Sequence, residues 1–241
     1  MDERDILFEF SHPERLRILE LLKKEELKLS SISNKLSITT AEVSRHLERL
    51  TNVKVIEKSS NGEYFISMFG TIVLNQISNI NYLNENRDFF LKHDLQSLPS
   101  SITCFKALSR SKVKNGTLDN VGLIKEVIER AEKYLHVISN QESRLFKEAI
   151  LETAERGIEV TRIYSKPEVI PEEIKKAKNI DVRIIDDIHF DMGVSDIMGG
   201  LTLPNTLGVM DYEQIFVGDD AVFITWLNNI VKYCKSKSRP I

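Results

Sequence analysis

The side chains with the clearest potential for chemistry form a polar stripe between residues 40 and 49. Thr40, Ser44 and Arg45 recur at helical spacing, while Val43 and Leu47 fall on the opposite side. Arginine can pair bidentately with the major-groove edge of guanine, and small hydroxyl groups fit close to bases and phosphates. The stripe therefore predicts contacts with double-stranded DNA from Thr40, Ser44 and Arg45.

Four further residues extend this predicted surface along the phosphate backbone: Arg49, Lys54, Lys58 and Asn61. Arg49 follows Arg45 by about one helical turn, and the other three belong to a predicted β-hairpin. Cationic side chains bind phosphates through charge, without reading the base sequence. We expect these four residues to fix the position of the protein on the duplex.

Three predicted helices and a hairpin must hold this surface. Capping residues are predicted at the start of each helix: Ser11 with Glu14 and Pro13, then Ser30, then Thr39 with Glu42. The second helix is expected over 30–36 and the third over 40–50. Strands are expected over 53–58 and 63–67, joined by a turn at Asn61-Gly62. Three helices followed by a hairpin is the order of a winged helix-turn-helix, predicted here for residues 1–70.

Two motifs in this region carry a family resemblance. The run from His12 to Leu19, and the run from Val43 to Leu50 that contains Ser-Arg-His-Leu, resemble winged-helix domains of the arsenical-resistance-repressor class. The resemblance implies that the second motif lies on a DNA-recognition helix. The sequence departs from the class at Asn52-Val53-Lys54-Val55, where the family has a glycine, so we expect a different turn into the wing.

A protein-interaction adaptor is the alternative function for this domain. Winged helices also serve as interaction modules, and acidic residues nearly balance the basic ones in this segment. The net charge of −3 for the whole chain argues against indiscriminate coating of nucleic acid, which relies on excess lysine and arginine. It leaves both sequence-specific DNA binding and an adaptor role open.

A long amphipathic helix is predicted from Thr71 to about Lys92, within a linker assigned to 71–95. Its apolar stripe is Val73, Ile77, Ile80, Leu83, Phe90 and Leu91. A two-fold dimer would double the contacts of a single recognition helix on a palindromic site. We therefore expect a homodimer, with this stripe as one surface that could form it.

Residues 96–241 are predicted to form an α/β domain, which makes the whole chain α+β. Strands and helices alternate from Tyr134 onward, which indicates a sheet with crossover helices. The strands are predicted over 134–139, 158–164, 182–185, 194–198, 200–203 and 214–217, and the helices over 142–156, 171–178 and after Gly218-Asp219. The basic residues Lys232, Lys235, Lys237 and Arg239 are expected to form a fraying tail.

This half resembles the methanogenesis-regulator middle domain of archaeal winged-helix regulators. The resemblance rests on Phe89–Leu95 with Leu98-Pro99, on Ser195-Asp196 ahead of Leu201–Pro204, and on Asp211-Tyr212 with Trp226. It implies a phospholipase D-like fold that senses an effector or dimerises. An archaeal source is expected on the same resemblance.

Catalysis is not expected. The phospholipase D reaction uses a nucleophilic histidine with a lysine two residues later, and none of the five histidines has one. A P-loop, His-Glu-x-x-His and Gly-x-Ser-x-Gly are also absent from the sequence. A phosphodiesterase-like enzyme remains the weaker of the alternatives.

An unknown small-molecule effector is the expected ligand of the C-terminal half, because open α/β sheets bind ligands beyond the carboxyl ends of their strands. The candidate residues are Ser139, Asn140, Tyr164, Ser165 and Asp196. The nearby acidic run Asp186-Asp187 with His189 and Asp191 suggests a metal site, but its spacing is not diagnostic and we predict no metal and no cofactor.

Compartment and membrane association are indicated by composition. The two cysteines lie far apart in the sequence, which is typical of a reducing interior and gives no disulfide framework. No apolar stretch approaches the roughly 18 residues of a membrane span. A cytoplasmic protein without a membrane partner is therefore expected.

Overall fold

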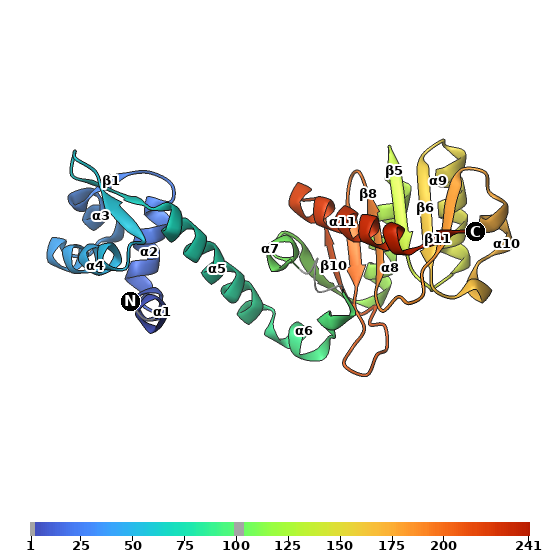
Figure 1. Ribbon diagram of the computed structural model, residues 1–241, viewed down its shortest axis with the longest axis horizontal. Coiled ribbons are helices and arrows are strands. Elements are labelled where there is room, and N and C mark those ends of the chain that lie inside the picture. Colours follow the sequence, from blue (N-terminus) through green and yellow to red (C-terminus); the bar gives the residue numbers. More distant parts are fainter. Residues whose placement is uncertain (1–2, 99–103) are drawn as a thin grey trace. The chain divides into compact units, whose positions relative to one another are not determined.

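The computed structural model describes residues 3–98 and 104–241, and the chain divides into two compact units, Met1–Glu85 and Asn86–Ile241 (Figure 1). The single linker helix predicted from Thr71 is interrupted. Helix α5 spans Met68–Glu85, α6 spans Arg87–Lys92, and the backbone leaves the helical conformation at Asn86 (φ −106°, ψ 24°). The predicted 71–95 segment is therefore divided between the two units.

The N-terminal unit has the predicted winged helix-turn-helix order. Its elements are α1 (Glu3–Phe10), α2 (Pro13–Leu22), β1 (Leu27–Lys28), α3 (Leu29–Leu36), α4 (Thr40–Asn52), β2 (Ile56–Lys58), β3 (Glu63–Ile66) and α5. The strands form an antiparallel sheet in the order β1-β3-β2. Val43, Leu47 and Leu50 of α4 are buried, as their i, i+4, i+7 spacing predicts, and pack in one core with Ile18 and Leu19 of α2.

The helix caps agree with the predictions at one position of three. The Thr39–Glu42 capping box is present, with both reciprocal hydrogen bonds. The Ser11–Glu14 box is wrong, because the Ser11 hydroxyl donates instead to the Phe8 carbonyl at 2.7 Å, and His12 is the N-cap without a side-chain bond. Ser30 lies inside α3, whose N-cap is Lys28.

The chain enters the wing through a Schellman turn, and the predicted strand over 53–58 begins only at Ile56. Val55 N–H donates to the Leu50 carbonyl and Lys54 N–H to the Thr51 carbonyl, which is the pairing that defines this helix end. Lys54 adopts φ 63°, the left-handed conformation that this position requires. Where the resembled class has a glycine at the entry to the wing, this chain therefore has Lys54 in the left-handed backbone conformation that glycine favours.

The C-terminal unit is a three-layer α/β domain. Its elements are the 3-10 helix η1 (Leu95–Ser97), α7 (Phe105–Leu108), β4 (Lys112–Asn115), α8 (Thr117–Glu129), β5 (Tyr134–Ile138), α9 (Arg144–Glu155), β6 (Glu159–Tyr164), the 3-10 helix η3 (Pro167–Val169), α10 (Glu172–Lys176), β7 (Ile180–Ile184), β8 (Asp191–Ser195), β9 (Gly199–Thr202), β10 (Gln214–Gly218), α11 (Ala221–Lys237) and β11 (Arg239–Pro240). The eight strands have the order β11-β7-β6-β5-β8-β9-β10-β4.

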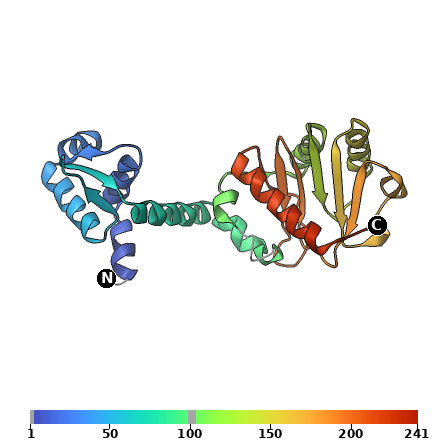
Figure 2. The same cartoon turned by 45° about the horizontal axis from the view of Figure 1, so that its top comes forward.

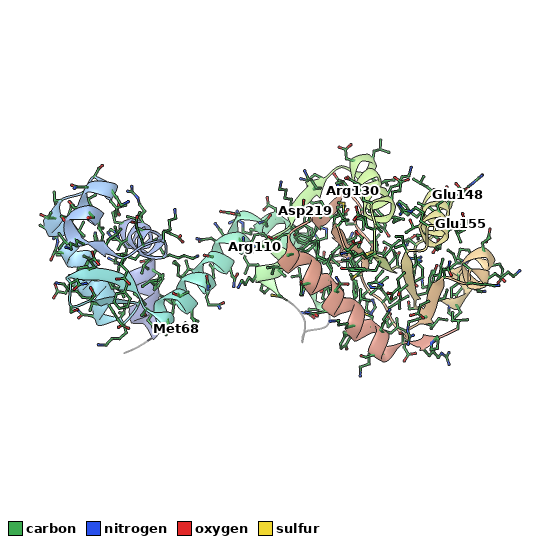
Figure 3. All side chains as sticks on the ribbon, turned by 90° about the horizontal axis from the view of Figure 1, so that it is seen from above. Met68, Arg110, Arg130, Glu148, Glu155 and Asp219 are labelled. Atoms are coloured by element: carbon green, nitrogen blue, oxygen red, sulfur yellow. The ribbon has the colours of Figure 1, made fainter. Side chains whose placement is uncertain are left out.

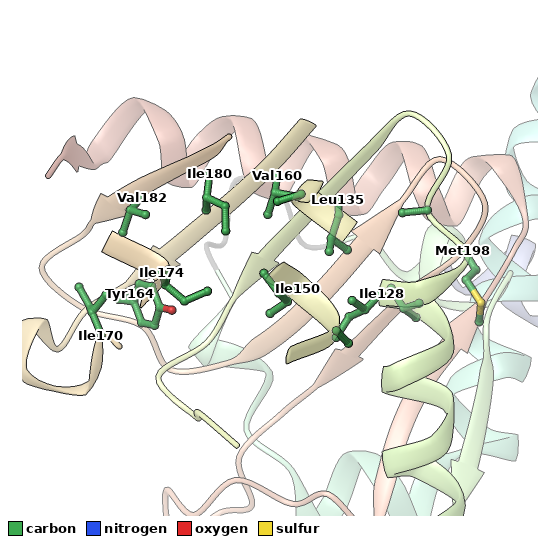
Figure 4. Packing of buried hydrophobic residues seen from close by; sticks show 14 of the residues in the cluster. Ile128, Leu135, Ile150, Val160, Tyr164, Ile170, Ile174, Ile180, Val182 and Met198 are labelled. Atoms are coloured by element: carbon green, nitrogen blue, oxygen red, sulfur yellow. The ribbon is translucent and has the colours of Figure 1, made fainter. Parts of the chain in front are cut away.

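The predicted alternation of strand and helix holds for part of this sheet. Strands β5, β6 and β7 are parallel and are connected through α9 and α10, whereas all other pairings are antiparallel. Helix α11 covers one face and α8 with α9 the other (Figure 2). The main core lies under α8 and α9 and includes Ile128, Ile150 and Tyr164 (Figure 4). The charged Arg130, Glu148 and Glu155 project outward from these helices (Figure 3).

Two predictions at the ends of this unit need correction. The basic tail does not fray, since Arg239 and Pro240 pair with β7, and Lys235 lies 3.6 Å from Asp181. Asp220, and not Asp219, caps α11 by accepting from Val222 N–H. Pro99, part of the motif noted in the sequence, lies outside the described residues. Within the described ranges, no helix is both long and apolar enough to cross a membrane.

Candidate nucleic-acid interface and effector cavity

Helix α4 presents the predicted contact residues on its exposed side. Thr40, Ser44 and Arg45 are all exposed, and Glu48 shares this side. Arg45 forms no ion pair with any residue that the structure describes. Its guanidinium is available to a ligand outside the domain.

The turn before α4 sets the angle at which the helix leaves α3. Ser37 takes φ 56°, and its N–H donates to the Asn34 carbonyl. The buried Ser33 hydroxyl donates to the Ile38 carbonyl at 2.6 Å, and Ile38 N–H returns a bond to the Ser33 carbonyl at 3.3 Å. These bonds hold α3 and α4 in the helix-turn-helix arrangement.

A buried carboxylate, Glu9, ties three helices together behind the exposed side of α4. Arg49 of α4 donates to both Glu9 oxygens at 2.8–3.1 Å, and Arg15 of α2 lies 2.9 Å from one of them. Both guanidinium groups also lie near the Phe8 ring, at 5.1 and 5.7 Å from its centre. The hydrogen bond from Arg49 holds the pKa of Glu9 below its ordinary value. Arg49, predicted from the sequence as a phosphate contact, is therefore already paired.

His46 packs at the edge of the domain core. Its ring lies 4.7 Å from that of His12, and it is half-buried. Burial, followed by the positive charges around it, lowers the pKa of His46. His46 therefore has a packing role in the domain.

The wing carries the remaining predicted contacts. Lys54, Lys58 and Asn61 are exposed on the turn after α4, on β2 and on the β2–β3 turn, respectively. The Lys58 amine lies 5.2 Å from the centre of the Tyr64 ring. At the tip, Gly62 adopts φ 79° and its N–H donates to the Ser59 carbonyl, so the tip is a turn followed by a left-handed glycine.

The C-terminal unit contains a cavity of about 270 Å³ between its sheet and helices α8 and α9. Most of its wall is apolar, including Val121 and Ile124 of α8, Phe146 and Ile150 of α9, and Met192 of β8. The exposed Thr117, Gln141 and Ser143 also line it, at the start of α8 and in the β5–α9 loop. The cavity is therefore apolar inside and bordered by polar residues.

One end of the cavity is polar and buried. Arg162 of β6 is 1% exposed and pairs with Glu142, which also accepts a 2.6 Å bond from the Tyr164 hydroxyl. Asp191 of β8 accepts from the Tyr212 hydroxyl. Burial raises the pKa of Asp191, and burial beside this carboxylate raises that of Tyr212.

The predicted effector residues do not share one site. Ser139 lines the cavity, and Tyr164 reaches its polar end through Glu142. Asn140 and Ser165 bond to each other at 2.8 Å beyond the strand ends. Asp196 accepts the Glu132 and Lys133 N–H groups next to the start of β5, whereas Ser139 follows its end. The prediction that places Asp196 with the others is therefore wrong.

The acidic residues that suggested a metal site, Asp186, Asp187 and Asp191 with His189, do not gather at one point in the structure. Asp187 lies 2.6 Å from the His189 imidazole in an exposed loop, while Asp191 points into the domain toward Tyr212.

Sequence reasoning missed three residues that organise these sites, namely Glu9, Glu142 and Arg162. A signal for Arg162 was present in the sequence. Val160, Arg162 and Tyr164 are two residues apart in a predicted strand, so their side chains lie on the same, buried face of the sheet. A charged residue in such a position is buried only when it is paired. No comparable signal existed for Glu142, whose partners are about twenty residues away, or for Glu9, whose partners Arg15 and Arg49 belong to two other helices.

Comparisons with known proteins agree with the N-terminal architecture. No curated protein matches the sequence. Similar solved structures include NucT from Helicobacter pylori (TM-score 0.45, 16% identity, 54% of this chain and 100% of that chain). They also include the archaeal chromatin protein TrmBL2, with a TM-score of 0.45 and 14% identity over 90% of this chain and 88% of that chain. A third is Nuc, a phospholipase D family member from Salmonella typhimurium, with a TM-score of 0.41 and 11% identity over 54% of this chain and 97% of that chain. Residues 12–58 match the family described as "Bacterial regulatory protein, arsR family", and this segment covers α2 through β2. The N-terminal unit therefore contains a helix-turn-helix domain of the arsR family.

Proposed function

We propose that this protein is a dimeric transcription regulator that binds double-stranded DNA through α4 and the wing and binds a small effector in the C-terminal cavity. The observation that carries the proposal is the exposed side of α4, where Thr40, Ser44 and unpaired Arg45 project from a capped helix in an arsR-family domain. Such a helix fits a major groove, with the residues of its first turns next to the bases.

The roles within this interface follow from the contacts of each side chain. Arg45 reads a base, and Thr40 and Ser44 contact base edges or adjacent phosphates. Lys54, Lys58 and Asn61 contact the backbone from the wing. Arg49, with its charge balanced by Glu9, supports α4 and contributes less to phosphate binding than the two lysines do.

Dimerisation is supported by exposed apolar residues on α5. Met68, Ile72 and Ile80 are each more than half exposed and recur at steps of four and eight along one side of this helix. Leu74, on another side, is buried in the core of the winged helix. A second copy that covers the exposed stripe would place two recognition helices on one palindromic site.

A sensing role, and not catalysis, is proposed for the C-terminal unit. The cavity offers a ligand an apolar interior with a few convergent polar groups, the usual composition of a small-molecule site. Its polar end holds Arg162 already paired with Glu142, and no histidine in the sequence is followed two residues later by the lysine that the phospholipase D reaction needs. These residues support ligand binding without turnover.

Selection of binding sites from a random duplex pool, with the purified full chain, tests the DNA-binding part of this proposal. We expect an enriched inverted repeat, because two symmetry-related copies of α4 contact two half-sites. Failure to enrich any motif, together with capture of a defined protein partner by the N-terminal domain, would favour the adaptor function instead.

A further inference from the structure

The C-terminal cavity has a charge composition that selects among small ligands. Its ionisable lining residues are Glu142, Arg162, Asp191 and Tyr212. The single guanidinium of Arg162 pairs with Glu142 and donates to the Tyr164 hydroxyl at 3.0 Å. Two of its five N–H groups are thus directed at groups of the protein itself, and its charge is balanced by the Glu142 carboxylate.

Asp191 is the carboxylate that lacks a directly paired cation. It is 8% exposed, and its partners are the hydroxyls of Tyr212 and Ser139 and the N–H of Asn140. No lysine, arginine or histidine within 3–98 or 104–241 forms a salt bridge with it, and Arg162 acts on it only at longer range. With Glu142, Asp191 and Arg162 ionised and the Tyr212 hydroxyl neutral, two carboxylates and one guanidinium leave one net negative charge at this end of the cavity.

A buried carboxylate without a paired cation is poorly solvated, which is why burial raises the pKa of Asp191. A cationic group placed against Asp191 would restore the lost solvation, whereas an anionic group would meet two carboxylates. A ligand rich in hydroxyl groups fits less well, because most of the wall is apolar and would leave many of those hydroxyls without partners.

We infer that the cavity binds a small primary amine, with its ammonium group on Asp191 and Tyr212 and its apolar body between α8 and α9. The cavity volume of about 270 Å³ is at the small end of the range of ligand pockets, which suits a compact monoamine. This inference deepens the proposed function, because it rests on the cavity being the effector site and names the class of effector.

A matched series of probes tests the inference on the full chain without DNA. Hexylamine, hexanol and hexanoate share an apolar body and differ in charge, and their affinities are measured by calorimetry and by the shift in melting temperature. We expect hexylamine to bind at least about tenfold more tightly than hexanol, with hexanoate weakest, because a charge-assisted hydrogen bond adds to the same apolar contact. Equal affinity for the three probes, or tightest binding of hexanoate, would overturn the inference, and this comparison needs no variant.

Two variants locate the selectivity. Asp191→Asn keeps the shape of the side chain and should reduce the preference for hexylamine over hexanol to about onefold, since only the charge is removed. Asp196→Asn, a change of the same kind at a residue that binds backbone N–H groups outside the cavity, should keep the preference. A preference that survives Asp191→Asn would also overturn the inference.

The proposed function is judged by a separate readout. The affinity of the full chain for a selected duplex is measured with and without hexylamine. Amine selectivity without any change in DNA affinity would uphold the ligand class and contradict the effector role. Specific DNA binding without amine selectivity would uphold the regulator and contradict the ligand class.

Discussion

Arg45 and Arg49 lie one turn apart on α4, yet their surroundings give them different roles. Arg45 projects from the exposed side of the helix, whereas Arg49 donates three hydrogen bonds to the buried Glu9 carboxylate. The sequence pattern treats both as exposed cations because the partner of Arg49 lies forty residues earlier, in α1. Only the structure separates the residue that is free to read a base, as we propose for Arg45, from the one that is paired within the domain.

Replacing Arg45 with alanine is expected to reduce discrimination between the selected duplex and a random duplex by about 1–3 kcal/mol, because a bidentate contact to a base is lost. Competition binding with the two duplexes measures this difference. Arg17→Ala, which removes an exposed arginine of α2, is the control and should leave discrimination unchanged. Full discrimination by Arg45→Ala would remove Arg45 from the proposed base contacts.

Glu9→Gln is expected to lower the free energy of unfolding by about 1.5–3 kcal/mol at neutral pH, since charge-assisted bonds from Arg15 and Arg49 are lost. The pKa of Glu9 is lower in the folded state, chiefly through the hydrogen bond from Arg49, than its ordinary value of 4.5. Its stabilising contribution is therefore present above about pH 4.5 and lost as pH falls through the lowered pKa.

Urea unfolding of the wild type and of Glu9→Gln over a pH series checks this prediction. The difference between the two should be constant at neutral pH and shrink below pH 4.5. Glu20→Gln changes an exposed glutamate of α2 and serves as the control. A difference that is independent of pH would mean that Glu9 stabilises the domain through packing and not through charge.

At the scale of elements, the turn that ends α4 holds the backbone of Lys54 in a left-handed conformation, which glycine adopts more easily than lysine. Lys54→Gly is expected to raise the free energy of unfolding by about 0.5–1 kcal/mol, because relief of the left-handed strain exceeds the added entropy of the unfolded chain. Lys58→Gly, made within β2, should lower it instead. Thermal unfolding of both variants is the measurement, and a destabilised Lys54→Gly would contradict the assignment of strain to this turn.

Helix α5 is the element that the dimer proposal depends on. Ile72→Asp or Ile80→Asp is expected to weaken the dimer by at least about tenfold, because a charge replaces an apolar side chain in the proposed contact. Sedimentation equilibrium should report twice the mass of one chain for the wild type and a shift toward one chain for these variants. Asn81→Asp, exposed on a different side of α5, is the control, and a wild type that is monomeric at all concentrations would contradict the proposal.

Elements with a strong local signal could be predicted from the sequence, and those without one could not. The Thr39–Glu42 box marked the start of α4 to the residue, and the apolar runs marked β5, β6 and β7 within two residues. Strand β4 has one half-buried position and three exposed ones, so it shows no apolar run. The two-residue β11 owes its existence to its pairing with β7, a contact that no local pattern encodes.

At the scale of the whole molecule, each of the two compact units contains one of the two proposed binding sites. Specific recognition is assigned to exposed residues of α4 and the wing, and ligand binding to a buried site of the C-terminal unit. The sequence could indicate the first site because its residues lie close together along the chain. The polar end of the cavity joins residues 142, 162, 191 and 212, and their convergence follows from the order of the strands.

The salt dependence of binding to the selected duplex tests the central claim most directly. If Lys54 and Lys58 of two protomers each neutralise a phosphate, about four contacts should give a slope of log K against log salt of about −3 to −4. A scrambled duplex should bind more weakly at every salt concentration. A slope near zero, or equal affinity for the selected and scrambled duplexes, would contradict sequence-specific DNA binding by α4 and the wing.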